Sequence, residues 1–159
     1  KGEDVISLFD EVLHTKSYLE IQQIRYSDIL EYSIDLPEEF EMISLPKLTL
    51  QPLVENALYH GVKEKRGQSK ITITFEDAGD DIVIQVLDDG IGMTEERLQE
   101  VKEGLKQNNN VGFGLAAVQG RLVLYFGAGY GIDIWSKYGE GTRIRVRIPK
   151  KFNFLDKKI

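Results

Sequence analysis

The apolar residues in the N-terminal part of the chain follow helical spacing in two stretches and alternate in a third. The helical repeat over residues 3–27 predicts one long helix, and the alternation over residues 30–36 predicts a short strand. Pro46 is expected to open a second helix, which runs to about residues 59–60 and stops at Gly61.

The rest of the chain reads as two strand pairs separated by two helices. Alternation and turn residues predict strands over 71–75 and 82–86, helices over 95–106 and 114–126, and strands over 131–137 and 142–148. Residues 107–110, which are Gln followed by three Asn, have no packing face, and we expect a mobile loop there.

The last strand indicates how the sheet is covered. Its isoleucine and valine residues fall on one face, and Arg143, Arg145 and Arg147 fall on the other. The arginine face is interpreted as solvated. A sheet with one apolar face predicts an α+β fold, a two-layer sandwich of helices on one side of a mixed, mostly antiparallel sheet, preceded by the long helix.

Composition narrows the classes of protein that fit. The chain has 159 residues, 42% of them hydrophobic and 29% charged, with a net charge of −6 and no cysteine. These values describe a globular domain and exclude disulfides, thiolate metal sites and cysteine nucleophiles. The negative charge argues against nucleic-acid partners. Because the chain opens on Lys1 without an initiator methionine, we expect it to be a fragment.

An acidic motif follows the predicted strand over residues 82–86. Residues 88–92 read Asp-Asp-Gly-Ile-Gly. A carboxylate at the end of a buried strand is costly without a donor partner, and an adenine amino group is one such donor. Gly90 and Gly92 allow the backbone to approach a flat ring or a phosphate. The alternative interpretation is an ordinary Asp-Gly turn.

The second predicted helix carries a polar flank beside its apolar stripe. Asn56, His60 and Lys63 are four and three residues apart, so they share one side of the helix. An amide oxygen suits Mg²⁺, and the two basic side chains suit phosphate oxygens. The alternative is a surface helix with an ordinary polar flank.

Two glycine pairs complete the candidate chemistry. Gly112-Phe113-Gly114-Leu115 opens a helix, where free backbone N–H groups suit a phosphate, although a loop-to-helix hinge explains the pair equally well. Gly139-Glu140-Gly141-Thr142 is either part of a site or a hairpin turn.

These four segments, in this order, resemble the ATP-binding domain shared by sensor histidine kinases, type II topoisomerases, Hsp90 chaperones and mismatch-repair ATPases. The stretches Leu19–Tyr26, Leu45-Pro46 and Leu50–Gly61 are similar to bacterial sensor histidine kinases of the YesM/LytS class. A Walker P-loop is absent from the sequence.

The resemblance implies a role for each motif. Asn56 would hold Mg²⁺, with His60 and Lys63 near the phosphates, and Asp88 would bind the adenine amino group. Residues about 95–111 would form a lid over the ATP. The further ATP-binding residues implied are Gly90, Gly92, Met93, Gly112, Phe113, Gly114, Leu115 and Thr142.

The resemblance also implies a domain division and partners. Residues 1–29 would be a connecting helix, 30–150 the catalytic domain and 151–159 a tail. The histidine that accepts phosphate would lie upstream, as it does in that family. His14 lacks the expected sequence context and is interpreted as a solvated helix residue. A response regulator, a homodimeric full-length protein and a cytoplasmic position beside a membrane are implied as well.

The sequence departs from the family pattern at several points. Ala116, Ala117, Gln119 and Gly120 stand where a polar pair and a charged stretch are common, and Tyr59 stands where a basic residue is common. Pro52 stands where hydrolytic relatives carry a general base, which favours transfer to histidine over hydrolysis.

Glu55 and Asn56 are the predicted catalytic residues, Glu55 with its alternative as a solvated helix residue. Other interpretations of the chain remain: a nucleotide-binding module without catalysis, an interaction domain that pairs through residues 3–27, and a hydrolytic ATPase.

Overall fold

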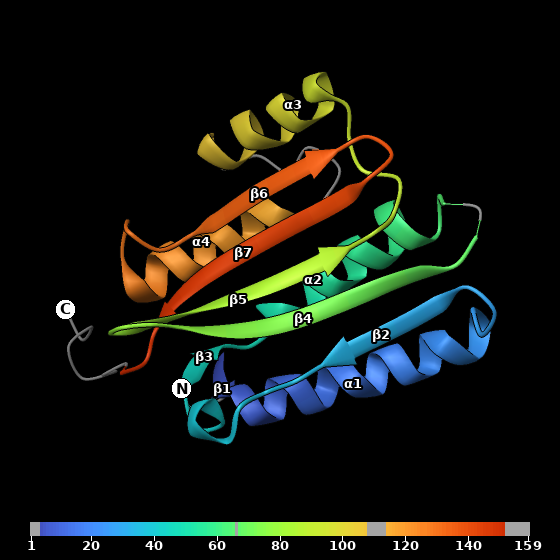
Figure 1. The fold of residues 1–159 in the computed structure, drawn as a ribbon. Coiled ribbons are helices and arrows are strands. Elements are labelled where there is room, and N and C mark those ends of the chain that lie inside the picture. Colours follow the sequence, from blue (N-terminus) through green and yellow to red (C-terminus); the bar gives the residue numbers. More distant parts are fainter. Residues whose placement is uncertain (1–3, 66, 108–113, 152–159) are drawn as a thin grey trace.

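A computed structural model describes residues 4–65, 67–107 and 114–151 and shows a five-stranded sheet with helices packed on one face (Figure 1). The strand order is β2-β4-β5-β7-β6, in which β2 pairs parallel with β4 and the other pairs are antiparallel. The predicted mixed, mostly antiparallel sheet is confirmed. The strands are β2 (Leu30–Ile34), β4 (Ser69–Ala78), β5 (Asp81–Asp88), β6 (Ile132–Lys137) and β7 (Gly141–Pro149).

The helices lie on the apolar side of the sheet or along its edges. In Figure 1, α2 and α4 lie behind the sheet, α1 runs beside β2, and α3 lies beyond β6. Their bounds are α1 (Leu8–Arg25), α2 (Leu50–Asn56), α3 (Glu95–Lys106) and α4 (Leu115–Phe126). A π-helical segment, Ala57–Val62, continues α2, and a 3-10 turn spans Glu38–Phe40.

Alternation along the strands builds the core. The inward apolar positions of β4, β5 and β7 are isoleucine, valine and phenylalanine residues that pack against α2 and α4 in one cluster. The arginine row of β7 lies on the opposite face, where Arg145 is 3.5 Å from Glu76 and Arg143 lies over the Trp135 ring. The predicted division of the two faces of β7 is therefore confirmed.

The predicted helix over residues 3–27 is wrong at its beginning. Val5–Ser7 form strand β1, which pairs antiparallel with β3 (Ser44–Pro46) in a small second sheet. The helix begins at Leu8, where the Ser7 hydroxyl accepts a hydrogen bond from the N–H of Asp10 at 3.1 Å. Local periodicity cannot report a strand whose partner lies far along the chain.

The second predicted helix is displaced at both ends. Pro46 ends β3, and α2 begins only at Leu50. Gly61 is not its stop, because the π-helical segment continues through it to Val62. π-Helical turns inside helices frequently accompany functional sites, and this one carries His60 toward the end of β5.

The remaining predicted elements agree with the structure to within a few residues. The helix over 95–106 is confirmed, and the Thr94 hydroxyl accepts from the N–H of Arg97 at 3.2 Å. The predicted loop lies mostly outside the described residues, which stop at Gln107.

α1 packs into the same core as the sheet. Leu8, Val12 and Leu19 are buried there, while Phe9 and Ile24 on the other side of the helix are exposed. The division of the chain at residue 29 stays a prediction, but α1 does not stand apart from the sheet. Within the described ranges, none of the helices has the length and apolarity needed to cross a membrane.

Candidate functional site

A cavity of about 350 Å³ lies where the π-helical segment, the end of β5 and the β6–β7 hairpin meet. Six residues singled out from the sequence line it: Asn56, His60, Asp88, Gly92, Met93 and Thr142. Six others were missed: Gly61, Glu64, Ile91, Thr94, Arg97 and Tyr138. The motifs from three distant parts of the chain therefore converge on one hollow.

Asp88 is the buried acid of this cavity. It is the last residue of β5 and only 4% exposed, and its Oδ1 accepts a hydrogen bond from the N–H of Gly90 at 2.9 Å. Burial raises the pKa of Asp88 to about 6, although the N–H groups of Gly90 and Thr142 act in the opposite direction. A carboxylate with this environment is suited to accept a hydrogen bond from a ligand.

The neighbouring acid, Asp89, forms hydrogen bonds with the beginning of β4 and does not line the cavity. Its Oδ1 accepts hydrogen bonds from the Ser69 hydroxyl at 2.5 Å and from the N–H of Lys70 at 2.7 Å. Burial raises its pKa, but these hydrogen bonds and the charge of Lys65 outweigh burial, so the pKa of Asp89 is lowered. Asp89 ties the loop to β4 and leaves Asp88 to face the cavity.

Two glycines let the π-helical segment approach the end of β5. A Cβ on Gly61 would lie 2.5 Å from Oδ1 of Asp88, and a Cβ on Gly90 would overlap the backbone of Gly61. Gly92 has a φ of +71°, and its Cβ would overlap the carbonyl of Lys137. Gly90 and Gly92 therefore permit backbone contacts that a side chain would block.

A hydroxyl pair supports the floor of the cavity. Ser136 Oγ accepts from the N–H of Met93 at 2.8 Å, donates to the carbonyl of Gly141 at 2.9 Å, and lies 2.8 Å from Oγ1 of Thr142. Sequence reasoning missed Ser136. The available signal was its register, since it shares the inward face of β6 with Ile132 and Ile134, where a polar residue is unexpected.

Asn56 offers an unpaired polar atom. Its side chain is 6% exposed, and its Oδ1 has no hydrogen-bond partner among the described residues. A buried oxygen without a partner is uncommon and calls for a ligand that completes it. His60 lines the same cavity, and its Nδ1 is 4.0 Å from Glu64.

Other predicted site residues lie outside the cavity wall. The Lys63 ammonium lies over the Tyr59 ring, 5.0 Å from its centroid, and Glu55 accepts a hydrogen bond from Gln51 at 3.1 Å. Gly112 and Phe113 fall outside the described residues. Gly114 adopts a φ of +67° immediately before α4, and Leu115 is buried in the core.

The raised pKa of Asp88 predicts a pH-dependent stability. The ordinary value is 3.8 and the folded value is about 6, so the proton is bound more tightly in the folded state. The contribution of this tighter proton binding to the free energy of unfolding is present below about pH 4 and is lost as the pH rises through 6. Relative to Asp88→Asn, the free energy of unfolding of the wild type should fall by about 3 kcal/mol between about pH 4 and pH 7. Thermal unfolding of both chains across this range tests it, and a constant difference contradicts it.

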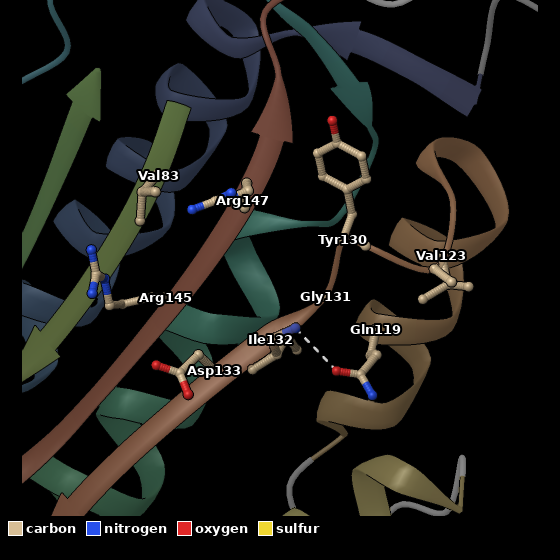
Figure 2. A pocket seen from close by; sticks show the side chains of 11 residues that line it. Val83, Gln119, Val123, Tyr130, Gly131, Ile132, Asp133, Arg145 and Arg147 are labelled. Atoms are coloured by element: carbon tan, nitrogen blue, oxygen red, sulfur yellow. Dashed lines mark hydrogen bonds between the residues drawn. The ribbon is translucent and has the colours of Figure 1, made fainter. Parts of the chain in front are cut away.

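A second hollow, of about 450 Å³, lies at the beginning of β6 (Figure 2). There the Gln119 side chain accepts from the N–H of Ile132 at 3.0 Å and donates to the carbonyl of Leu105 at 2.9 Å. Arg147 lies 3.8 Å from Asp81, which also accepts from the Tyr130 hydroxyl. Gln119, a departure from the family pattern, thus links α4 to β6 and α3.

Comparison with known sequences identifies the same region. A model of the family described as histidine kinase-, DNA gyrase B-, and HSP90-like ATPase matches residues 45–151. The sensor histidine kinase YesM of Bacillus subtilis is 34% identical over 146 residues, and the sensor histidine kinase BtsS of Escherichia coli K12 is 31% identical over 148 residues. Each alignment covers 92% of this chain, which spans 24% of each relative.

Solved structures share the fold. The catalytic domain of histidine kinase ThkA superposes with a TM-score of 0.64 over 94% of this chain and 97% of that domain, at 16% identity. A structure of ThkA in complex with the response regulator protein TrrA superposes with a TM-score of 0.63, at 17% identity, over 92% of this chain and 41% of that one. With its cavity at the matched motifs, the chain belongs to the family of histidine kinase-, DNA gyrase B- and HSP90-like ATPases.

Proposed function

We propose that this chain is the ATP-binding catalytic domain of a sensor histidine kinase and transfers the γ-phosphate of ATP to a histidine. The observation that carries the proposal is the pairing of two groups in one cavity: the buried carboxylate of Asp88 and the unpartnered amide oxygen of Asn56. The first suits an amino group of a base, and the second suits a cation that accompanies phosphates.

Asp88 would recognise the adenine. Its Oδ1 is already bonded to Gly90, so the other carboxylate oxygen is the acceptor for the adenine amino group. Gly61, Gly92 and Met93 would form the walls around the ring, and Thr142, held by Ser136, would form the floor.

Asn56 fits a magnesium ion. Mg²⁺ prefers oxygen ligands and keeps several waters, so one amide oxygen together with phosphate oxygens is an ordinary set. The ion would neutralise charge on the phosphates. His60, on the same wall as Asn56, would lie near the phosphates, whereas Lys63 would need to leave the Tyr59 ring to do so.

The transfer would rest on positioning and charge neutralisation. A ring nitrogen of the acceptor histidine would attack the γ-phosphorus as the bond to the β-phosphate oxygen breaks, and ADP would leave. Pro52 cannot act as a base for water, and imidazole is itself a good nucleophile near neutral pH. Backbone N–H groups at the start of α4, after Gly114, would face the transferred phosphate.

The proposed partners follow from the relatives. The acceptor histidine would lie on a dimerising helix upstream, and a response regulator would then take the phosphate. The full-length protein would be a homodimeric membrane sensor with this domain in the cytoplasm. The chain spans about a quarter of the relatives it matches, so these assignments concern the longer protein.

The test is phosphate transfer from γ-labelled ATP to the dimerising segment of YesM, supplied as a separate polypeptide. We expect label on the acceptor that is labile to acid and stable to alkali, with no phosphate released when the acceptor is omitted. Phosphate release without an acceptor would show a hydrolytic ATPase instead. Tight ATP binding without transfer would show a binding module, and no binding at all would favour an interaction domain.

Glu55→Gln is expected to lower the transfer rate by about a hundredfold, if Glu55 takes the proton of the attacking histidine. The affinity for ATP should stay within about twofold of the wild-type value, because Glu55 does not line the cavity. Single-turnover transfer and equilibrium ATP binding measure the two effects separately. An unchanged transfer rate would assign Glu55 to its hydrogen bond with Gln51 alone.

A further inference from the structure

At the end of α2 farthest from the cavity, two side chains form hydrogen bonds with one peptide group. The N–H of Thr49 donates to Oε2 of Glu11 at 3.4 Å, and the carbonyl of Leu48 accepts from Nη2 of Arg121 at 2.5 Å. This N–H and this carbonyl belong to the same peptide bond. Glu11 belongs to α1 and Arg121 to α4, so side chains from two helices bind the N–H and the carbonyl of a single peptide unit.

The carboxyl group of Glu11 is buried, which is unfavourable for its charged form. Its side chain is 1% exposed, and burial raises its pKa to about 7, against the lowering influence of the Thr49 and Leu48 backbones and of Arg121. A buried carboxyl group is costly unless it is hydrogen-bonded. The Thr49 hydroxyl donates to the carbonyl of Pro46 and does not cap α2, and the N–H of Thr49 itself is paired with Glu11.

The backbone beside this peptide is strained. Leu48 has a φ of +60°, which is uncommon for a residue with a side chain. Its side chain is 52% exposed, so burial of the leucine does not explain the conformation. Such strain persists where the surroundings over-determine the backbone, and the contacts from Glu11 and Arg121 are that constraint.

α2 connects the Leu48–Thr49 peptide to the cavity. Asn56 is seven residues beyond Thr49, which is about two helical turns along a rigid element. The Asn56 amide oxygen is buried, so its position is set by the helix that carries it. A change in the direction of α2 at Thr49 would therefore move this oxygen relative to Asp88, which sits on the sheet.

We infer that Glu11 and Arg121 are positioning residues of the nucleotide site, which clamp the Leu48–Thr49 peptide and so aim the Asn56 amide oxygen at the metal that accompanies the phosphates. The inference rests on the proposed function. It adds that Glu11 of α1 and Arg121 of α4, neither of which lines the cavity, act on its metal-holding side and leave its adenine side unaffected.

The test compares ATP binding with and without Mg²⁺ for the 159-residue chain, for Glu11→Gln and for Arg121→Lys. In the wild type, Mg²⁺ should tighten ATP binding. In each variant this gain should fall by about tenfold, as for other residues that orient a metal ligand. Binding of ATP without Mg²⁺ should stay within about twofold of the wild-type value. Loss of structural integrity alone would weaken both measurements together.

Matched controls lie on α1. Glu20→Gln and Arg25→Lys change the same residue types on the exposed side of the helix and should leave the Mg²⁺ gain unchanged. Arg121 is only half-buried, so Arg121→Lys tests the clamp even where Glu11→Gln weakens folding. A normal Mg²⁺ gain in either folded variant overturns the inference while leaving the proposed function intact. A wild-type chain that binds no ATP overturns the proposed function first.

Discussion

Asp88→Asn is expected to abolish the stabilisation of this chain by ATP. In the proposed complex, the Gly90 N–H and the adenine amino group would be two donors, and the Asp88 carboxylate would offer each of them an acceptor oxygen. An asparagine has one acceptor oxygen and one NH₂ group, so one of the two donors always faces another donor. Leaving a buried donor unpaired and losing a charged acceptor costs about 3 kcal/mol, which weakens binding by about a hundredfold or more.

Thermal unfolding with and without Mg·ATP measures this effect. At a hundredfold excess over its dissociation constant, ATP stabilises the wild type by about 2.7 kcal/mol, or roughly 5–10 °C for a domain of this size. Asp88→Asn should show almost no rise. Its own melting point without ATP should be no lower than that of the wild type near neutral pH, because a buried charge is removed.

Asp89→Asn is the matched control for this experiment. The substitution weakens the hydrogen bonds from Ser69 and Lys70, so the unliganded chain should lose about 1–3 kcal/mol of stability. The rise in melting point with ATP should remain, because Asp89 does not line the cavity. An ATP shift that survives in Asp88→Asn, or disappears in Asp89→Asn, would contradict the assignment of the two acids.

Gly61→Ala is the second substitution with a large expected effect. The added Cβ would lie 2.5 Å from Oδ1 and 2.7 Å from Cγ of Asp88, so the carboxylate must leave its place beside Gly90. Alanine is a better helix former than glycine by about 1 kcal/mol, which offsets part of the strain in the fold. We expect ATP affinity to fall by about a hundredfold with a nearly unchanged melting point.

Gly129→Ala provides the comparison, because a Cβ at that position meets nothing within 4 Å. It should bind ATP as the wild type does. Isothermal titration of both variants separates loss of binding from loss of folding. Wild-type affinity in Gly61→Ala would show that the contact between the π-helical segment and β5 does not shape the adenine pocket.

Asp88→Asn and Gly61→Ala both alter the Asp88 carboxylate, the first from β5 and the second from the π-helical segment. Asp88→Asn changes the chemistry of the acceptor, while Gly61→Ala keeps the carboxylate and changes its position. If both remove ATP binding, the site needs a carboxylate at one defined place and not merely a negative charge near the cavity. Glycine at 61 leaves room for that carboxylate, and glycine at 90 lets the backbone approach the backbone of Gly61.

Much of the fold follows from short-range patterns. The strands β4, β5 and β7 carry apolar residues at every second position of their middle parts, and this period of two places those side chains in the core. α3 combines an N-cap threonine with an apolar stripe, so its bounds are readable from local sequence. Asp88 was also recognisable, because an acid stands at the end of an apolar strand beside two glycines.

By itself, the sequence determined the sheet, most of the helices and the order of the four motifs, since periodicity and turn chemistry are local. Only the tertiary structure decided how distant segments meet. It paired β1 with β3, continued α2 through Gly61 as a π-helical segment, and placed Ser136 under Met93. It also set Glu11 and Arg121 on one peptide. Such contacts join residues tens of positions apart, and their energies depend on burial and geometry that no local pattern records.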